Sequence, residues 1–366
     1  MKQYELGELL PYEQPSKYIV NSTEYDDSYP TPVLTAGKSF ILGYTDETDN
    51  IFDELPVIIF DDFTTATQFV DFKFKVKSSA MKILHINTDL VLPKYIYYLL
   101  QTIHIEHSTH KRYWIQQFSK VKVDIPPIPE QERIVSQIEE SLSQLDSAVE
   151  TLKKTKQQLE VYRLSALKDV FMKTTPMTPF KSITESRLGK MLDKEKNTGI
   201  MREYLRNINV RWFDFDLSDL LEMRIEDKET EKYSIEKGDL VICEGGEPGR
   251  CAVWESNDTV YYQKALHRVR FTDGSNPKYY MYYLWFINRI GSLSKYFTGT
   301  GIKHLTGQSL AKVPVPSISV QQQNEAVSYI EDRFYSIDQV DKILNQSLQQ
   351  AEALRQSILK KAFSYE

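Results

Sequence analysis

The nonapeptide RLSALKDVF at residues 163–171 is nearly repeated as RQSILKKAF at residues 355–363, which lies 192 residues further along the chain. Arg, Ser, Leu, Lys and Phe occupy the same places in both copies. Without a gap, the same offset pairs residues 118–171 with residues 310–363 and keeps 18 of 54 positions identical. Because units of solenoid arrays are only about 20–50 residues long, this repeat indicates duplication of a whole domain together with a helix.

The match resumes upstream, where PKYIYYLL (93–100) corresponds to PKYYMYYL (277–284). We therefore expect an α+β protein with an internal pseudo-two-fold repeat, in which two mixed α/β domains are separated by two long helices that form an antiparallel coiled coil. The expected segments are a first domain over 1–128, a first helix over 129–175, a second domain over 176–319 and a second helix over 320–366.

Heptad spacing of apolar residues predicts the two helices. Proline and glycine are absent from residues 130–175, so the first helix can run for about 42 residues, or about 60 Å at 1.5 Å per residue. The expected interface residues are Val135, Ile138, Leu142, Leu145, Val149, Leu152 and Leu159 in the first helix, and Val327, Ile330, Phe334, Ile337, Leu344, Leu348 and Ile358 in the second.

Each seam is too long to be buried against one compact domain, and each has a partner of matching length. A pseudo-two-fold axis favours antiparallel pairing, which would bring Lys156 and Asp341, two polar breaks in the seams, within about one turn of each other. Two independent, solvent-exposed amphipathic helices are the alternative.

Composition is typical of a water-soluble globular chain, with 41% hydrophobic and 12% aromatic residues. No signal-like start or apolar run of about 18 residues is present, so we expect a cytoplasmic protein without a membrane partner. Cys243 and Cys251 do not have metal-ligand spacing and are expected to be reduced, structural thiols.

Charge is segregated along the chain, although its net value is only −6. Residues 1–70 carry 3 basic and 13 acidic side chains, whereas residues 71–122 carry 9 basic and 3 acidic ones. In the second repeat, residues 260–312 carry 8 basic side chains and 1 acidic one. The same part of each repeat is thus electropositive, as a pair of polyanion sites requires. Neutralisation of each basic stretch by its acidic neighbours is the alternative.

Two strands account for much of this positive charge. The stretch FVDFKFKVK (69–77) alternates apolar residues with Lys73, Lys75 and Lys77, which predicts one buried face and one lysine-bearing face. In the second repeat, KALHRVRF (264–271) places Lys264, Arg268 and Arg270 on one face. Each is preceded by a buried strand that runs into a polar loop, in PVIIFDDFTT (56–65) and GDLVICEGGEPGR (238–250). The glycines of the second loop suit either close approach of a ligand or a plain turn.

Motifs for catalysis and cofactor binding are missing. There is no G-x-x-x-x-G-K-[ST] phosphate loop, no Rossmann glycine fingerprint and no [DN]-P-P-[YF] tetrapeptide of the adenine methyltransferases, so we expect a non-catalytic protein without a cofactor. His104, His107 and His110 would fan across a helix rather than converge, so we expect no metal site. Glu226 and Lys228 belong to a run of alternating charge, which favours a solvated surface over a nuclease centre.

The first copy has IPPIPEQERI (125–134) before a long helix that ends in RLSALKDVF. The second copy has the degenerate counterpart VPVPSISVQQQNEAV (313–327) before a helix that ends in RQSILKKAF. Together with the two strand-to-loop segments, these motifs resemble the specificity subunit of type I restriction–modification systems. The resemblance covers essentially the whole chain. The second copy departs from the pattern, because SVQQQNE stands where the first has IPEQERI.

The resemblance implies two target recognition domains, each of which reads half of a split double-stranded DNA sequence in the major groove. It also implies that the helices dock two methyltransferase subunits, through which endonuclease/translocase subunits join, and the departure puts equal affinity at the two ends in doubt. On this basis we expect phosphate contacts from the basic strands and base contacts from the loops. The candidates are Lys73, Lys75, Lys77, Asp61, Asp62, Thr64 and Thr65 in the first domain, and Lys264, Arg268, Arg270, Glu244, Arg250, Lys303 and His304 in the second.

Two other functional classes stay open. A coiled-coil scaffold that does not read DNA would explain the heptads, but not the positive segment that recurs in both domains. A self-contained endonuclease would need a carboxylate cluster for metal ions, and none stands out in the sequence.

Overall fold

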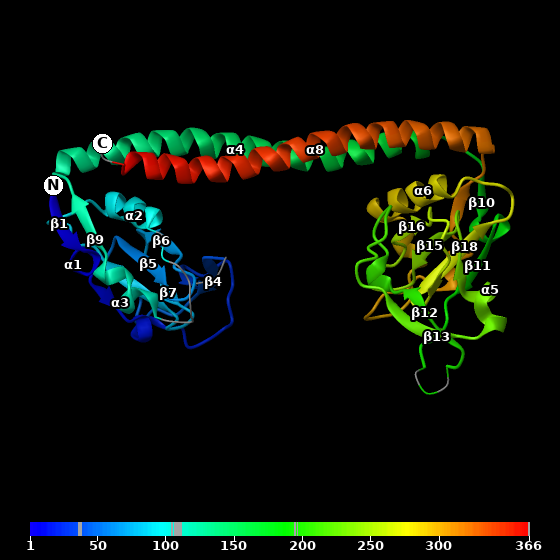
Figure 1. Ribbon diagram of the computed structural model, residues 1–366, viewed down its shortest axis with the longest axis horizontal. Coiled ribbons are helices and arrows are strands. Elements are labelled where there is room, and N and C mark those ends of the chain that lie inside the picture. Colours follow the sequence, from blue (N-terminus) through cyan, green and yellow to red (C-terminus); the bar gives the residue numbers. More distant parts are fainter. Residues whose placement is uncertain (36–38, 104, 106–111, 194, 196, 365–366) are drawn as a thin grey trace. The chain divides into compact units, whose positions relative to one another are not determined.

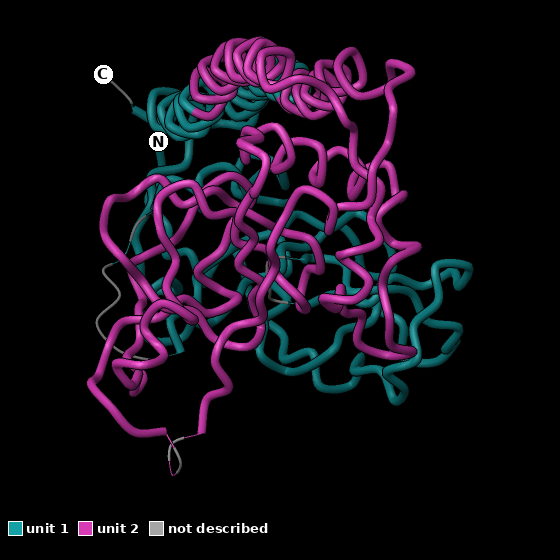
Figure 2. Tube along the Cα trace, turned by 90° about the vertical axis from the view of Figure 1, so that its right-hand side faces the viewer, with its two compact units in different colours: residues 1–152, 346–366 teal, residues 153–345 magenta. Residues whose placement is uncertain are grey.

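The computed structural model describes residues 1–364 except 36–38, 104, 106–111, 194 and 196. The chain divides into two compact units, one made of residues 1–152 and 346–366 and the other of residues 153–345 (Figure 2). We call them unit 1 and unit 2. Each contains one globular domain and part of both long helices, α4 (Ile128–Phe171) and α8 (Val320–Ala362).

Unit 1 holds the first globular domain. Its elements are β1 (Lys2–Glu5), α1 (Leu6–Leu9), β2 (Tyr12–Glu13), η1 (Pro15–Tyr18), β3 (Thr31–Leu34), β4 (Ile41–Thr45), β5 (Val57–Asp61), β6 (Thr67–Val70), β7 (Lys75–Val76), β8 (Met81–His85), α2 (Pro93–Thr102), α3 (Tyr113–Gln116), η2 (Phe118–Lys120) and β9 (Lys122–Ile125).

An antiparallel sheet with the order β2-β8-β5-β6 lies at the centre of this domain (Figure 1). All five residues of β5 are buried because both faces of the sheet are covered. Ile58 and Phe60 pack with helix α2, whereas Val57 and Ile59 pack with residues of the small sheet β4-β3-β7. The continuous apolar run of β5 follows from this two-sided burial.

Unit 2 repeats this plan with additional strands. Its elements are β10 (Met177–Pro179), η3 (Phe180–Ser182), β11 (Thr184–Leu188), β12 (Ile200–Leu205), η4 (Asn207–Asn209), β13 (Leu221–Ile225), η5 (Asp227–Glu229), α5 (Thr230–Tyr233), β14 (Ser234–Ile235), β15 (Leu240–Cys243), β16 (Cys251–Val253), β17 (Val260–Tyr262), β18 (Leu266–Phe271), α6 (Pro277–Arg289), η6 (Leu293–Tyr296), α7 (Gly307–Leu310) and β19 (Pro314–Pro316).

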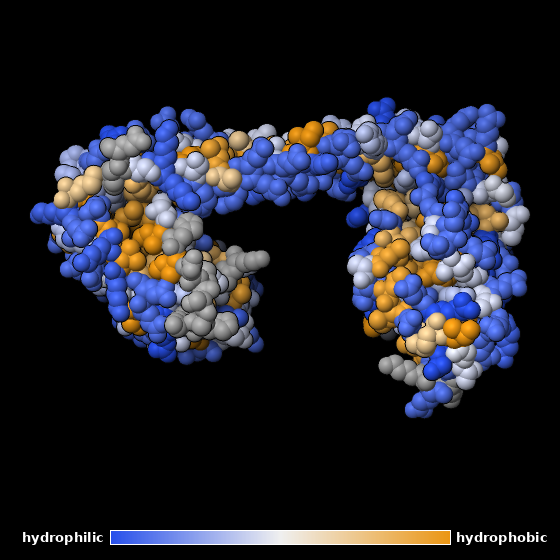
Figure 3. Space-filling model, in the orientation of Figure 1, coloured by the Kyte–Doolittle hydropathy of each residue, from blue (hydrophilic) through white to orange (hydrophobic). Residues whose placement is uncertain are grey.

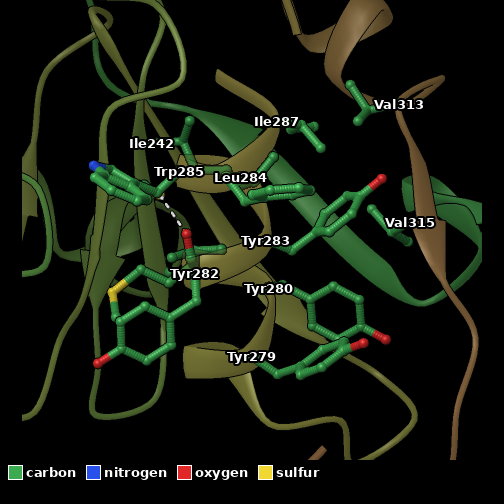
Figure 4. Close-up of a cluster of buried hydrophobic side chains, with 14 of the residues drawn as sticks. Ile242, Tyr279, Tyr280, Tyr282, Tyr283, Leu284, Trp285, Ile287, Val313 and Val315 are labelled. Carbon is green, nitrogen blue, oxygen red and sulfur yellow. Dashed lines mark hydrogen bonds between the residues drawn. The ribbon is translucent and has the colours of Figure 1, made fainter. Parts of the chain in front are cut away.

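The central sheet of unit 2 has the order β11-β18-β15-β16, which matches that of unit 1 strand for strand, and its β15 is likewise fully buried. Helix α6 covers one face, where Trp285 lies beside Ile242 and Tyr283 points toward Val313 and Val315 (Figure 4). The other face packs against residues of the sheet β13-β12-β17-β14. Cys243 and Cys251 are free and buried, as expected of structural thiols, and burial raises the pKa of the Cys243 thiol to about 11.

In both units α4 and α8 run antiparallel. Asp146 bonds Arg355 in unit 1, and Arg163 bonds Asp338 in unit 2. Lys156 Nζ lies 3.8 Å from an oxygen of Asp341, so the predicted polar contact is confirmed. Helix α4 begins one residue before its expected start and ends four residues before its expected end.

The seam residues lie on the inner side of this helix pair. Those that are fully buried are Ile138, Leu142, Leu159, Val327, Ile330, Phe334 and Leu344, and the partly buried ones are Val135, Leu145, Val149, Leu152, Ile337, Leu348 and Ile358. The outer surface of the pair is largely hydrophilic in the view of Figure 3. The heptad pattern therefore predicted the buried side of both helices correctly.

Candidate nucleic-acid interface

In unit 1, the polar loop between β5 and β6 is held by the carboxylate of Asp61. Oδ1 accepts hydrogen bonds from the backbone N–H groups of Phe63 (2.9 Å) and Thr64 (3.4 Å), and Oδ2 accepts one from the Thr64 hydroxyl (2.7 Å). Thr65 has a φ of 62°, which is strained for a β-branched residue. Both carboxylate oxygens of Asp61 therefore bind groups of the loop itself, and the side chain is buried. The structure corrects the expectation that Asp61 contacts a base.

Asp62 joins the same loop to a second segment. Its Oδ1 accepts the N–H of Trp114 at 2.8 Å, and its Oδ2 lies 3.4 Å from Lys82 Nζ. Asp62 is only 4% exposed, so it too positions the loop and the prediction of a base contact was wrong. Together with the hydrogen bond from the Tyr113 N–H to the Asp62 carbonyl (3.5 Å), this contact places the segment that carries the exposed Arg112 beside the loop.

The side chains of this loop that remain exposed are Phe63, at 56%, and Thr64, with Thr65 partly exposed. We name residues 62–66 and 112–115 the first tip. An exposed phenylalanine on a loop fixed by several hydrogen bonds is the feature that sequence reasoning missed, because Phe63 alone does not differ from a core residue.

The three lysines after β6 do not share one face, because β7 is only two residues long and Phe74, Lys75 and Val76 are all buried. Lys75 is fully buried and donates to Glu47 Oε2 and to the Asp49 carbonyl, both at 2.8 Å. The expectation that it contacts phosphate was wrong. Lys73 is exposed and lies 3.4 Å from Asp53, whereas Lys77 is exposed.

In unit 2, the glycine-rich loop after β15 is held by Asn207 and Arg250. The guanidinium of Arg250 donates to the backbone oxygen (3.0 Å) and to Oδ1 (2.9 Å) of Asn207, and its other end pairs with Glu247 at 3.1 Å. Gly246 has a φ of 73°, and a Cβ there would meet the Asn207 side chain at 3.1 Å. Arg250 therefore supports the loop, while Gly246 and Glu247 are exposed.

A turn over residues 298–304 packs against this loop. The N–H of Leu305 donates to the Glu244 carbonyl at 2.7 Å, and a Cβ on Gly245 would meet the His304 ring at 3.0 Å. Thr298 and His304 close the turn with two backbone hydrogen bonds of 2.8 and 2.9 Å. Exposed at its end are Lys303 and Ile302, which at 74% has a larger exposed fraction than any other large hydrophobic residue described.

We name residues 244–250 and 298–304 the second tip. The predicted residues Glu244, Arg250, Lys303 and His304 meet there, as their positions after β15 and before α7 allow. Lys264 is exposed in the β17–β18 turn, whose Ala265 carbonyl accepts the Glu244 N–H at 2.9 Å, so Lys264 also lies beside this tip.

Of the two predicted phosphate contacts in β18, Arg268 is buried and Arg270 is partly exposed but paired with acidic residues. Arg268 is 4% exposed and donates to the carbonyls of Glu231 and Ser234, and Arg270 holds Asp239 with two hydrogen bonds of 2.7 and 3.0 Å. The first four residues of β18 are buried, so the strand does not alternate between a buried and an exposed face, and β14 of the second sheet covers Arg268. The charges of Lys75 and Arg270 are thus neutralised by acidic neighbours, which was the alternative explanation for the basic stretches.

The two tips are built in the same way. In each unit a loop follows the central buried strand, β5 or β15, and its first residue bonds the backbone of a segment that leads into a short helix, α3 or α7. The first tip exposes Phe63 and, to a smaller extent, Ile115, and the second tip exposes Ile302. Each tip also exposes at least one cation, Arg112 or Lys303. The duplication thus extends to the backbone contact that holds each tip, whereas the exposed apolar side chains come from different segments.

The remaining chemistry of the described residues is sparse. Among them, no group of three or more His, Cys, Asp or Glu side chains could hold a metal ion, and no helix is long and apolar enough to cross a membrane. His104, His107 and His110 lie outside the described residues.

Comparison with known proteins gives a consistent picture. Residues 1–161 match the family model of the type I restriction modification DNA specificity domain. The specificity subunit of the type I restriction enzyme EcoR124I/EcoR124II from Escherichia coli is 54% identical over 126 residues, which are 33% of this chain and 31% of that protein. The EcoKI specificity subunit of Escherichia coli strain K12 is 26% identical over 272 residues, 67% of this chain and 58% of the relative. The matches thus span less than two thirds of either relative.

Solved structures share the fold over the full chain. A chain from a structure of the complex assembly and conformational transition of the type I R-M system has a TM-score of 0.73 at 15% identity and covers 99% of this chain and 97% of its own. The HsdS subunit from Thermoanaerobacter tengcongensis has a TM-score of 0.51 at 15% identity and covers 99% of this chain and 96% of its own. The α+β fold with two long helices expected from the sequence is therefore confirmed.

Proposed function

We propose that this chain, a relative of the type I restriction enzyme specificity subunits, is the sequence-reading, non-catalytic subunit of a type I restriction–modification complex. Its two globular domains, residues 1–128 and 176–319, each read one half of a bipartite double-stranded DNA target through the first and second tips. The observation that carries the proposal is the recurrence of one tip construction in both repeats.

Partner binding is assigned to the helix pair. Two methyltransferase subunits dock on the helices, one toward each domain, and endonuclease/translocase subunits join through them in the cytoplasm. Two grooves, one in each unit, support one docking site per unit. The groove in unit 2 is lined by Tyr162, Ser165 and Asp169, and the groove in unit 1 is lined by the equivalent residues of the repeat, Leu354, Ser357 and Lys361. Because their charges differ, the two sites have unequal affinity.

Phosphate contacts supply affinity and base contacts supply sequence preference. Arg112 in unit 1 and Lys264 and Lys303 in unit 2 are exposed at or beside the tips, and Lys77 is exposed at the end of β7. These four side chains are assigned to phosphates. Thr64, Thr65, Glu244 and His304 are assigned to base edges, where Glu244 suits the amino group of cytosine.

The test is to express the chain with and without a methyltransferase subunit of the same system and to map N6-methyladenine across the host genome. A bipartite methylated sequence that depends on this chain supports the proposal and gives the target. A scaffold that does not read DNA would leave methylation unchanged when the chain is removed.

A further inference from the structure

Both tips expose large apolar side chains. Phe63 is 56% exposed and Ile302 is 74% exposed, although each could be replaced by a polar residue at no cost to the interior. Exposing a large apolar side chain to water is unfavourable by roughly 25 cal/mol per Å². Single exposed hydrophobic residues are common on protein surfaces, so exposure alone decides nothing.

Rigidity distinguishes these two residues. The backbone N–H of Phe63 is bonded to Asp61, and the strained Thr65 closes the same loop. Ile302 lies in a turn closed by Thr298 and His304, in which Lys303 Nζ also donates to the Gly299 carbonyl at 2.9 Å. The backbone that carries each side chain is therefore held by hydrogen bonds, and less backbone entropy is lost when a partner binds.

Position is the second distinguishing feature. Phe63 follows β5 and Ile302 precedes α7, and each lies in a tip that also exposes a cation, Arg112 or Lys303. Their places in the two tips are not equivalent by sequence, since Gly245 stands where the first tip has Phe63. An apolar residue beside a cation thus arises in both tips from different segments.

We propose that Phe63 and Ile302 are specificity-determining residues, each of which packs against the C5-methyl group of a thymine in the half-site that its unit reads. This inference rests on the proposed function. In the major groove the thymine methyl is the apolar group that a side chain can recognise, and an adjacent cation can hold the neighbouring phosphate. Each half-site is thus expected to contain at least one thymine.

The experiment uses the full chain in complex with its methyltransferase subunit. Selection from a random duplex library first gives the target of the wild-type complex and of the Phe63→Ala and Ile302→Ala complexes. Each variant serves as the matched control for the other, because each changes one exposed side chain in one unit. Thermal unfolding confirms that both variants fold as the wild type does.

We expect Phe63→Ala to lose its preference for thymine at one position of one half-site and to keep the other half-site unchanged. Ile302→Ala should do the converse. Replacing that thymine by deoxyuridine removes only the methyl group, and it should weaken wild-type binding by about three- to fourfold, as expected for one buried methyl. The same replacement should leave the matching alanine variant unaffected.

Three results would overturn the inference. These are a target without thymine in either half-site, equal sensitivity of wild type and variant to deoxyuridine, and variants that keep both half-sites but lose the methyltransferase subunit. Failure of the proposed function looks different, since the wild-type complex would then select no bipartite sequence at all.

Discussion

The ammonium group of Lys75 lies in the interior of unit 1, where Glu47 and the Asp49 carbonyl receive its hydrogen bonds. We predict that Lys75→Met lowers the free energy of unfolding by about 3 kcal/mol, because the mostly buried Glu47 carboxylate then loses its cationic partner and keeps only hydrogen bonds from Asn21 and Ser22. Denaturant unfolding of the full chain measures this. The control Lys73→Met removes an exposed pair with Asp53 and should change the free energy by less than about 1 kcal/mol. Equal effects would contradict the assignment.

The same pair makes stability depend on pH. The hydrogen bond from Lys75 lowers the pKa of the Glu47 carboxyl in the folded state. A lowered folded-state pKa contributes stability above the unfolded value of about 4.3, and this contribution is lost as pH falls through the folded pKa. We predict that Lys75→Met loses less stability than the wild type when the pH is lowered from about 6 to about 3, a range that includes the unfolded-state pKa of a glutamate. A parallel loss in both proteins would argue against it.

Exposed cations of the tips should act on all sequences alike. We predict that Lys303→Gln weakens binding of the methyltransferase complex to target and non-target duplexes by a similar factor, and reduces the slope of log affinity against log salt by about 1. Fluorescence anisotropy over a salt series measures this. Lys312→Gln, which lies outside both tips, is the control. Loss confined to the target would mean that Lys303 reads a base.

Side-chain roles were the least predictable part of the sequence. An alternating pattern indicates which residues share a face, but it does not say whether a second layer covers that face, as happens for Arg268 and Arg270. Likewise, the carboxylates of Asp61 and Asp62 occupy a polar loop typical of binding sites, yet they bond backbone N–H groups and neighbouring side chains of the same unit. Tertiary contacts of this kind have no periodic signal.

At the scale of elements, a repeated glutamine ties each long helix to the domain before it. Gln131 accepts the N–H of Leu92 at 2.7 Å, and Gln323 accepts that of Asn276 at 2.7 Å, and both glutamines are buried. Each therefore caps the residue before helix α2 or α6. This is why Gln131 and Gln323 are among the identical positions of the duplicated segment, which the sequence alone left unexplained.

We predict that Gln131→Leu and Gln323→Leu each destabilise the chain by about 1–3 kcal/mol, because a buried N–H then lacks its acceptor. Hydrogen exchange should show the loss first at the start of α2 in one variant and of α6 in the other. Gln144→Leu, at an exposed position of α4, is the control and should have little effect. If the exposed substitution is as harmful as the buried ones, the capping role is incorrect.

The helices were the most predictable elements, since heptad spacing reports burial directly. The reciprocal bonds Asp146–Arg355 and Arg163–Asp338, which the sequence analysis did not predict, join residues at identical positions of the two copies. Departures from symmetry, such as Lys156 with Asp341, occur where the copies differ in sequence. The heptad pattern indicated the register of the two helices because polar residues interrupt both seams.

For the whole molecule, the proposed function makes the helix pair the spacer between the two half-sites. A heptad adds about 10.5 Å of helix at 1.5 Å per residue, which corresponds to about three base pairs at 3.4 Å each. We predict that one heptad inserted between residues 152 and 153 of α4 and another between 348 and 349 of α8, opposite positions in the pair, lengthen the unread gap by about three base pairs. The bases read in each half should stay the same, because neither tip is altered.

Sequence selection with the methyltransferase complex measures the gap. A single insertion in α4 is the matched control, since it shifts the seam of one helix against the other and should abolish bipartite binding rather than lengthen the gap. Complexes with both insertions that select the original gap would refute the spacer role while leaving recognition by the tips intact. Changed half-site bases would instead show that the helices take part in reading the sequence, because the insertions touch no residue of either tip.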